Sequence, residues 1–445
     1  MINARKVALD VVNSVFYKDA YSNIVLNMHL NKSNLKDKDK ALVTEIVYGT
    51  IKYKLTIDKI IQSYLKSNIK KLDKDILNIL RITIYQIRYL DKIPEFAAVN
   101  EAVNLSKRVC SKFSKLVNGV LRNYIRDKNK KIYYNGKDVL ESLSFNYSFP
   151  KWMIKLFINQ YGEKISEDIL KGLNERPNIT VRVNDLKSDY DSVFEEMTKE
   201  GYNIEPGFIC PEAIKIFNGK NIENNILFKK GKVTVQDESA MLVAPSMDLK
   251  ENMVVLDLCS APGGKTTHIS EITSDKSTVH AYDLHENKLC LIEDNANRLG
   301  IKNIVTKSMD ASLYKEELEN FADRILIDVP CSGLGIIRKK PEIKWNKNTS
   351  DINNLIHIQR KIMKNSAKYL KDNGVLLYST CTLNKKENEE NVKWFLRNNK
   401  HFKIEKLYYG NCDNIIYHKE GYVTVLPNKS MDGFFICRMR KIVGV

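Results

Sequence analysis

Apolar residues recur at helical spacing throughout the first 125 positions. One helix face carries Ala4, Val7, Ala8, Val11 and Val15. Further helical patterns cover residues 38–53, 55–67, 73–90 and 97–125. We therefore predict that residues 1–125 are all helical.

The middle of the chain changes from a polar stretch to shorter apolar patterns. Residues 126–148 are polar and rich in Asn, Lys and Asp, which is typical of a linker. A helical pattern follows over residues 149–172. The next patterns predict a strand at Ile179–Val183, a helix at 188–200, and strands at 202–204, 213–217 and 232–235. This segment is predicted to be a small α+β module.

Residues 236–445 show strand and helix patterns in alternation. The strand patterns lie at 253–258, 278–282, 303–306, 324–328 and 374–379, and the helical patterns at 264–272, 285–299, 351–371 and 385–399. Such alternation predicts a parallel sheet with helices on both faces. A hairpin of Tyr422–Leu426 and Gly433–Arg438 is expected to close that sheet.

The composition is typical of a globular protein with several domains. The chain has 445 residues, of which 43% are hydrophobic, and no apolar run reaches the roughly 18 residues that a membrane span needs. The first residues continue into an amphipathic pattern, unlike a signal peptide. We expect a soluble cytoplasmic protein with domains at 1–128, 145–235 and 236–445.

The eight cysteines are far apart in the sequence. Cys412 and Cys437, the nearest pair, are 25 positions apart, and the seven histidines include no His-Glu-x-x-His motif. This spacing disfavours both zinc sites and a disulfide framework. We therefore expect no metal, and any reactive cysteine should act as a single thiol.

The net charge of +17 is concentrated in the first third of the chain. Residues 1–150 contain 27 Lys and Arg against 14 Asp and Glu, a net of +13. In the helical pattern at 97–125 and just after it, one face carries only basic residues: Arg108, Lys112, Lys115, Arg122 and Arg126. An ordinary solvated helix face is the alternative. The concentration at one end favours a domain that meets phosphates.

A small-residue loop follows the first predicted strand of the C-terminal region. It reads Cys259, Ser260, Ala261, Pro262, Gly263, Gly264 and Lys265, and it opens a helix. This arrangement is typical of a nucleotide-type cofactor site, where glycines let the backbone approach the ligand. Asp283 ends the second strand, where it can accept both ribose hydroxyls, and Asp310 follows the third, near an adenine edge. Aspartates that merely start loops are the alternative reading.

Two cysteines follow the carboxyl ends of central strands. Cys331 comes three residues after Asp328 at the end of the fourth strand, and Cys381 follows the fifth. Most free cysteines are buried and inert. Two of them at equivalent strand ends, where α/β sheets bind ligands, favour a chemical role.

Together these motifs resemble those of the S-adenosylmethionine-dependent RNA cytosine-C5 methyltransferases. The resemblance rests on Asp257-x-Cys-Ser-Ala-Pro-Gly-Gly-Lys-Thr266, Asp328-Val-Pro-Cys-Ser-Gly333 and Ser379-Thr-Cys-Thr382. It extends to Arg338–Trp345, Gln359 and Met431–Phe435, to a NusB-like domain at Asn100–Val103 and Leu116–Arg122, and to the middle module at Thr180–Asn184 and Val235–Ala240. Ser260 and Val329 depart from it, since alanine is common at both positions.

The resemblance implies the fold and the cofactor. The fold is α/β, a Rossmann-like class I methyltransferase domain preceded by an all-α NusB-like domain and a small α+β module. S-adenosylmethionine would lie along Cys259–Lys265, with Asp283 on the ribose, Asp310 near the adenine and Asp328 beside it.

The resemblance also implies the chemistry. Cys381 is the nucleophile that adds to carbon 6 of cytosine, which makes carbon 5 reactive towards a methyl group. Cys331 assists the release of this adduct, and Asp328 supplies or shares a proton at nitrogen 3. Lys265 is a candidate for stabilising the thiolate form of Cys381.

The domain combination implies an RNA partner, namely 16S ribosomal RNA or an assembly intermediate of the small subunit. A C5 methyltransferase for transfer RNA is one alternative, and only the N-terminal domain argues against it. A non-catalytic RNA-binding assembly factor is another, against which the two cysteines and Asp328 speak. Uracil-C5 methylation is disfavoured by the paired cysteine motifs. The oligomeric state and the base that removes the C5 proton stay open.

Overall fold

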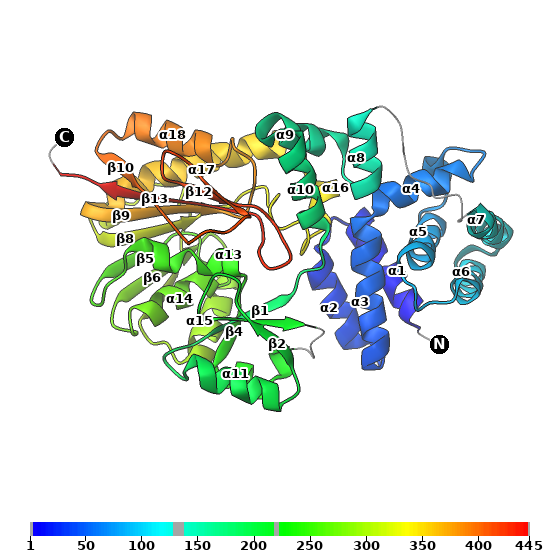
Figure 1. Cartoon of the computed structure of the whole chain (residues 1–445), viewed down its shortest axis with the longest axis horizontal. Coiled ribbons are helices and arrows are strands. Elements are labelled where there is room, and N and C mark those ends of the chain that lie inside the picture. The colour runs from blue at the N-terminus through cyan, green and yellow to red at the C-terminus, as the bar shows by residue number, and fades with distance from the viewer. Residues whose placement is uncertain (1–2, 128–137, 218–221, 444–445) are drawn as a thin grey trace. The chain divides into compact units, whose positions relative to one another are not determined.

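The computed structural model of the chain divides into two compact units, which are described separately (Figure 1). Unit 1 comprises Met1–Asn174 and Ile337–Asn346, and unit 2 comprises Glu175–Ile336 and Lys347–Val445. The structure describes residues 3–127, 138–217 and 222–443. Within these stretches, no helix has both the length and the apolar character that a membrane crossing requires.

Unit 1 is helical, as the apolar periodicity predicts. Its helices are α1 (Ala4–Tyr17), α2 (Ser22–Lys32), α3 (Asp37–Lys52), α4 (Lys54–Ser63), α5 (Lys74–Tyr89), α6 (Glu95–Cys110), α7 (Ser114–Asp127), α8 (Val139–Tyr147), α9 (Lys151–Tyr161), α10 (Glu163–Asn174) and α16 (Ile343–Asn346). The Asn3 side chain caps α1 by accepting a hydrogen bond from Lys6 N at 2.9 Å. The apolar face of α1, including Val7, Val11 and Val15, is buried in one core with residues of α3, α5, α6 and α7.

The segment at 97–125 forms two helices, where the pattern predicted one. α6 ends at Cys110, whose extended backbone (φ −156°, ψ 93°) leads through a short 3₁₀ turn into α7. Five exposed basic side chains are distributed over the two helices and this turn: Arg108, Lys112, Lys115, Arg122 and Arg126. We call these five residues the basic surface. Because the helix is interrupted, Arg108 does not share a helix with the last three.

Two other stretches of unit 1 differ from the prediction. α8 lies inside the expected linker, and the Asp138 side chain caps it by accepting from Leu140 N at 2.9 Å. Residues 128–137 of that linker lie outside the described residues. The helical pattern at 149–172 breaks at Gly162, whose φ of +79° separates α9 from α10.

A segment from the second half of the sequence completes unit 1. This anchor segment, Ile337–Asn346, ends in α16. Glu342 accepts hydrogen bonds from Ser22 N at 3.1 Å and from Ser22 Oγ at 2.7 Å, which satisfies the first N–H of α2. The sequence pattern did not predict α2. The apolar residues of α2 do not gather on one face, and Glu342, which binds its first N–H group, is remote in sequence.

Lys344 fixes the anchor segment through several polar contacts. Its ammonium group donates to Asn174 Oδ1 at 2.8 Å and to the carbonyl oxygens of Lys52 and Ser148, each at 3.2 Å. It also lies 3.6 Å from the centre of the Phe149 ring. Burial, and then the charge of Lys52, hold the pKa of Lys344 well below its ordinary value.

Unit 2 contains two sheets. The strands are β1 (Ile179–Val183), β2 (Asn203–Pro206), β3 (Ala213–Phe217), β4 (Val233–Val235), β5 (Val254–Asp257), β6 (Thr278–Asp283), β7 (Ile304–Ser308), β8 (Ala322–Asp328), β9 (Leu370–Thr380), β10 (Phe402–Glu405), β11 (Ile415–Tyr417), β12 (Val423–Val425) and β13 (Phe434–Lys441). The helices are α11 (Tyr190–Lys199), α12 (Ile226–Lys229), α13 (Glu238–Met241), α14 (Gly264–Ile272), α15 (Leu289–Leu299), α17 (Thr349–Tyr369) and α18 (Glu389–Asn398). The smaller sheet is antiparallel in the order β2-β3-β1-β4.

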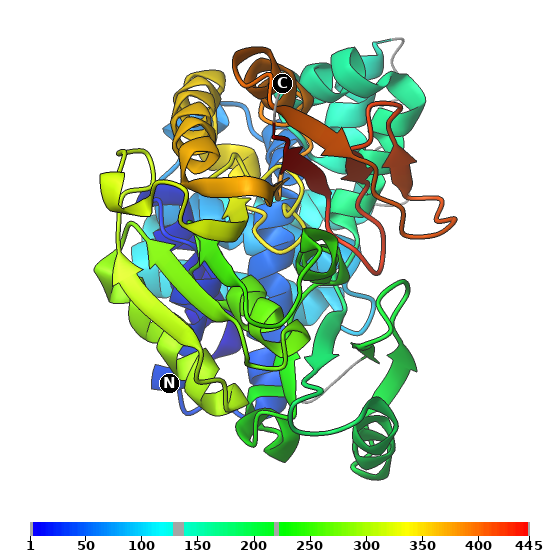
Figure 2. The ribbon, with the colours of Figure 1, turned by 90° about the vertical axis from the view of Figure 1, so that its left-hand side faces the viewer.

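The larger sheet has the predicted architecture. Its strand order is β11-β12-β13-β9-β8-β5-β6-β7, and β10 pairs with β13. The five strands β5, β6, β7, β8 and β9 run parallel to one another. α14 and α15 cover one face, and α17 and α18 cover the other (Figure 1, Figure 2). The expected hairpin is β12 and β13, of which β13 joins β9 in antiparallel fashion. The α/β fold class, with its helical N-terminal part and small α+β module, is confirmed.

Candidate active site

Strands of the larger sheet bring the predicted site residues to one edge. β5 ends at Asp257, β6 at Asp283 and β8 at Asp328. In the parallel register, Asp328 stands opposite Ser379, two residues before Cys381. Because parallel strands have their carboxyl ends at the same edge, the loops that follow them meet there.

The loop between β5 and α14 forms a tightly held cradle. Ser260 donates to Tyr282 O from its N at 2.9 Å and from its Oγ at 2.8 Å. Gly263 has a φ of +98°, and a Cβ at this position would lie 3.1 Å from Ile292 Cα, so a side chain would be both strained and crowded. This tight turn leads directly into α14, so the first N–H groups of the helix lie next to the loop.

Asp257 lies where this loop begins. Its Oδ2 accepts from Thr266 Oγ1 at 2.7 Å, whereas its buried Oδ1 has no hydrogen-bond partner among the described residues. Burial raises the pKa of Asp257 to about 7. The unpaired oxygen can accept a hydrogen bond from a bound cofactor.

The two aspartates predicted to hold a nucleoside lie at neighbouring strand ends. Asp283 Oδ2 accepts from Ala261 N at 3.2 Å, and Asp283 Oδ1 accepts from His285 N at 3.0 Å. Asp310 follows β7 and accepts from Ser312 N at 2.9 Å. Asp283 is therefore joined to the cradle, whereas no such bond joins Asp310 to it within the described part of the chain.

Four carboxylates surround the Cys259 thiol. Burial raises the pKa of Cys259 well above its ordinary value. The negative charges that add to this effect belong to Asp257, Asp328, Asp283 and Asp310. Cys259 therefore stays a neutral thiol, which is a poor nucleophile. The same carboxylates make the cradle electronegative, which fits a cofactor with sulfonium and ammonium charges.

The two cysteines at the strand ends lie in contact. The Sγ atoms of Cys331 and Cys381 are 3.2 Å apart, at hydrogen-bond distance, and both cysteines are free thiols. Gly335 N donates to Cys381 O at 2.9 Å, so the loop after Cys331 also holds the backbone of Cys381. Both thiols are partly exposed, so a substrate atom can approach them.

The contact between the two thiols raises the pKa of Cys331. The hydrogen bond with Cys381 is the largest cause that raises the pKa of Cys331 well above its ordinary value, followed by burial and by the charges of Cys381 and Glu387. Cys331 is therefore held as a neutral thiol in contact with Cys381.

An ion pair lies at the start of α14. Lys265 Nζ is 2.6 Å from Asp328 Oδ2, and Ser379 Oγ donates to Asp328 Oδ1 at 2.8 Å. Burial alone would lower the pKa of Lys265, but Asp328, together with the charges of Cys381 and Asp257, holds it above its ordinary value. Lys265 is therefore cationic beside the thiol pair, as its position in the motif suggested.

Glu387 is a supporting residue that the sequence did not reveal. This buried carboxylate accepts from Ser332 N at 2.8 Å and from Ser332 Oγ at 2.6 Å, directly beside Cys331. It also accepts from Gln359 Nε2 and Asn384 Nδ2, each at 3.1 Å. Glu387 lies in a run of charged residues that reads as a solvated helix start, so no signal in the pattern pointed to it.

Arg182 is a second residue whose role was missed. It belongs to β1, is fully buried, and donates to Glu271 Oε2 at 2.9 Å and Glu271 Oε1 at 2.7 Å. It also donates to Gln236 Oε1 and, at 3.0 Å, to Gly264 O at the start of α14. The small α+β module thus holds the helix that carries the cradle. Arg182 and Gln236 both lie in motifs of the family resemblance, which was the available signal.

Replacing Gly335 by alanine is expected to displace the Cys381 loop. A Cβ at Gly335 would lie 2.0 Å from Gly433 O and 2.9 Å from Cys381 O, so backbone atoms must move. We expect the rate of the reaction at this site to fall by about ten- to a hundredfold. The control is Gly119→Ala in α7, where a Cβ meets nothing within 4 Å. Steady-state kinetics with both variants make the comparison, and unchanged turnover in Gly335→Ala would contradict the prediction.

Family models match three parts of the chain. The model described as 16S rRNA methyltransferase RsmB/F matches residues 244–440, the NusB family matches residues 2–126, and an RsmF/B-like ferredoxin-like domain matches residues 149–223. The three matches follow the predicted order of a helical domain, a small α+β module and a methyltransferase.

Similar proteins cover almost the whole chain. The probable ribosomal RNA small subunit methyltransferase B of Bacillus subtilis (strain 168) is 36% identical over 99% of both chains. The ribosomal RNA small subunit methyltransferase B of Proteus mirabilis is 33% identical over 89% of this chain and 92% of its own.

Two solved structures are also similar. The crystal structure of PH0851 aligns with a TM-score of 0.82 and 28% identity, and it covers 98% of each chain. The crystal structure of NSun6 from Pyrococcus horikoshii with SFG has a TM-score of 0.60 and 26% identity, and the match covers 67% of this chain and 100% of its own. Sequence, domain order and fold agree, and the chain belongs to the ribosomal RNA small subunit methyltransferase B family.

Proposed function

We propose that this protein methylates carbon 5 of a cytosine in 16S ribosomal RNA, with S-adenosylmethionine as the methyl donor and a Cys381 adduct as the intermediate. The observation that carries the proposal is the thiol pair of Cys331 and Cys381, 3.2 Å apart beside the ion pair of Lys265 and Asp328. A covalent mechanism suits cytosine because its carbon 5 is a weak nucleophile until a group adds at carbon 6. The target base must be unpaired or flipped out to reach the thiols.

The cradle is proposed to hold the cofactor. When bound, S-adenosylmethionine supplies an electrophilic methyl group. Residues Cys259–Lys265 would hold it, with Asp283 at the ribose and Asp310 at the adenine. The unpaired Oδ1 of Asp257 and the carboxylates around Cys259 support this assignment, since both favour a polar, cationic ligand.

The state of Cys331 is compatible with the proposed division of roles between the thiols. Cys331 is held as a neutral thiol while it is hydrogen-bonded to Cys381, and the Cys381 motif is the one to which the family resemblance assigns the attack on carbon 6. The electron pair displaced from the ring makes carbon 5 the atom that takes the methyl group. Addition also ends the sulfur–sulfur hydrogen bond, which is the largest cause of the raised pKa of Cys331. Cys331 then loses its proton more readily and assists the step in which the C5 proton leaves and the carbon–sulfur bond breaks.

Asp328 is proposed to act at nitrogen 3 of the base. Addition of a thiolate places negative charge on the ring, and a proton at nitrogen 3 relieves it. Asp328 shares a short hydrogen bond with cationic Lys265, so the pair can supply or share that proton. Through Lys265, Asp328 also contacts the loop that would hold the methyl donor.

The substrate assignment rests on the helical part of the chain. The relatives are named for ribosomal RNA of the small subunit, and the five residues of the basic surface are exposed as a phosphate-binding surface requires. We propose residues 1–128 as an RNA-binding domain, 145–235 as a second RNA-binding module and 236–445 as the catalytic domain. The partner is 16S ribosomal RNA, as free RNA or within an assembly intermediate of the small subunit.

Bisulfite sequencing of total RNA from cells with and without this gene tests the proposed function. We expect one cytosine of 16S ribosomal RNA to lose its protection when the gene is absent and to regain it when the gene is restored. Loss of protection in a transfer RNA would favour the alternative substrate. If no cytosine changed, the proposed reaction would be wrong.

Removing charge from the basic surface is expected to flatten the salt dependence of RNA binding. Each phosphate contact contributes about 0.7 to 0.9 to the slope of log K against log salt. Replacing Lys112, Lys115 and Arg126 by glutamine should therefore lower the magnitude of that slope by about 2, while affinity for S-adenosylmethionine stays unchanged. Filter binding of a 16S transcript across a salt series measures the slope.

The matched control removes the same charge elsewhere in unit 1. Lys18, Lys32 and Lys38 are exposed after α1, on α2 and on α3. Replacing them by glutamine should leave the slope close to that of the wild type. Equal slopes for all three proteins would contradict the assignment. Substitution is preferable to deleting residues 1–125, because deletion would strip the partners of Glu342 and Lys344.

A further inference from the structure

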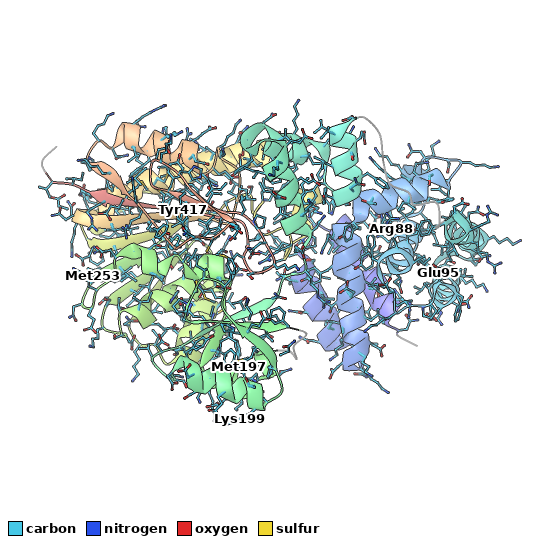
Figure 3. The ribbon with its side chains drawn as sticks, in the orientation of Figure 1. Arg88, Glu95, Met197, Lys199, Met253 and Tyr417 are labelled. Carbon is cyan, nitrogen blue, oxygen red and sulfur yellow. The ribbon has the colours of Figure 1, made fainter. Side chains whose placement is uncertain are left out.

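A groove opens between the start of α6 and the end of α7, within unit 1. It is lined by Glu95, Phe96, Val99, Asn100, Arg122 and Ile125, and its volume is about 520 Å³. Small-molecule sites have volumes of roughly 300–1,000 Å³. Figure 3 labels Glu95, which marks the position of the groove at the first turn of α6. We call it the Phe96 groove.

Phe96 is unusually exposed for a phenylalanine. Its side chain is 72% accessible, the largest value among the exposed large hydrophobic residues of the described chain. Isolated apolar residues on a surface are common and need no explanation. Phe96 differs because its ring borders a groove whose floor includes the buried Val99. A flat partner placed over the ring would therefore contact both the ring and the groove.

The polar groups of the groove fit the other parts of a nucleotide. The Asn100 side chain is exposed and forms no hydrogen bond with any described residue, so its amide offers both a donor and an acceptor. Arg122 is exposed, and within the described residues only its Nε is engaged, with Asn118 Oδ1 at 3.1 Å. The two NH groups of its guanidinium remain available, and such a fork matches a phosphate.

The charge around the groove favours a nucleic acid over a protein partner. The exposed charged residues of α7 are all basic, namely Lys115, Arg122 and Arg126. Arg122 belongs to both the basic surface and the Phe96 groove, so a strand held by the basic surface passes the groove. Aromatic platforms beside basic residues are the usual means of binding single-stranded nucleic acids.

We propose that the Phe96 groove binds one unpaired nucleotide of the RNA, with its base stacked on Phe96, its edge facing Asn100 and its phosphate on Arg122. The inference rests on the proposed function, because the occupant is part of the RNA that this enzyme methylates. The Phe96 groove would thus hold one base of the RNA in addition to the cytosine that reacts. The groove thereby selects RNA in which an unpaired nucleotide is presented to unit 1.

The test compares RNA binding by full-length variants. Phe96→Ala should weaken binding of a 16S transcript about tenfold or more, because the base loses its stacking partner, whereas Phe96→Trp should retain wild-type affinity. Phe96→Ala should leave the salt slope unchanged, since no charge is lost. Arg122→Gln should lower its magnitude by about 0.7, one phosphate on a single strand. Because Phe96 is exposed, its replacement leaves the core intact.

Ile24→Ala provides the matched control. Ile24 lies on α2 of the same unit and is 61% exposed, and its replacement should not change the affinity. Ultraviolet cross-linking of the wild type to the transcript should attach a nucleotide to the peptide that contains Phe96. Unchanged affinity in Phe96→Ala, or an equal loss in Ile24→Ala, would overturn the inference.

Two outcomes separate this inference from the proposed function. A wild-type protein that methylates the transcript, together with a Phe96→Ala variant of unchanged affinity, refutes only the groove. A wild-type protein that neither binds nor methylates the transcript refutes the proposed function, and the groove with it.

Discussion

Cys381→Ala is expected to abolish methylation, with a rate at least about a thousandfold below that of the wild type. The variant lacks the sulfur that is proposed to add to carbon 6. Cys331 lies at a different position, its Sγ 3.2 Å from that of Cys381, and is assigned to the release step. Burial keeps Cys259 a neutral thiol. Cofactor affinity should stay close to that of the wild type, since the cradle lies on β5 and α14. Transfer of labelled methyl groups to a 16S transcript measures the rate, and calorimetry measures the affinity.

The matched control is Cys290→Ala. Cys290 is an exposed thiol on α15, so its removal should leave both the rate and the affinity unchanged. Turnover near the wild-type level in Cys381→Ala would refute the nucleophile assignment. Loss of cofactor binding in that variant would instead show that the cysteine supports the cradle.

Cys331→Ala should trap the enzyme on its RNA. Addition and methyl transfer need only Cys381 and the cofactor, whereas release needs a group that assists removal of the C5 proton. Without it, the carbon–sulfur bond persists, and turnover should fall by at least about a hundredfold. A species that migrates slowly on a denaturing gel and disappears after nuclease treatment would be the covalent complex.

The double variant decides which sulfur forms the adduct. Cys331→Ala combined with Cys381→Ala should give no slow-migrating species, and mass spectrometry of the single variant should find the nucleotide on the peptide that contains Cys381. A Cys331→Ala protein that turns over normally without an adduct would remove Cys331 from the release step. An adduct in the double variant would assign the covalent bond to a third residue.

The catalytic half was predictable because its signals are local. Each strand of the parallel sheet is a short apolar run that ends in a polar residue, so Asp257, Asp283 and Asp328 could be placed at one edge from the pattern alone. The pattern also placed Cys331 and Cys381 at equivalent strand ends, but their contact depends on the pairing of β8 with β9, which the structure supplied. The roles of these residues came from the family resemblance, because spacing alone does not distinguish a nucleophile from an inert thiol.

Features that depend on remote partners were not predictable. Glu387 and Arg182 act through hydrogen bonds to residues 55 and 89 positions away, and neither lies in a pattern that indicates burial. α2 is stabilised by Glu342, 320 positions later. β10 and β11 were also missed, although β4 and β12, which are equally short, were predicted. β10 is held by its pairing with β13, and β11 by its pairing with β12. In each case tertiary contacts determine the local structure.

The anchor segment has a consequence for how the protein is made. Unit 1 contains the first 174 residues, yet it also requires Ile337–Asn346, which supply the capping group of α2 and the ammonium of Lys344. At roughly 5–20 residues per second, the ribosome delivers this segment about 10 to 35 seconds after residue 174. During that interval the helical unit lacks part of its polar network, so its folding cannot finish as synthesis proceeds from one end to the other. A chain that terminates before residue 346 is therefore expected to carry an unfinished helical unit. Folding of this unit thus depends on synthesis of most of the chain.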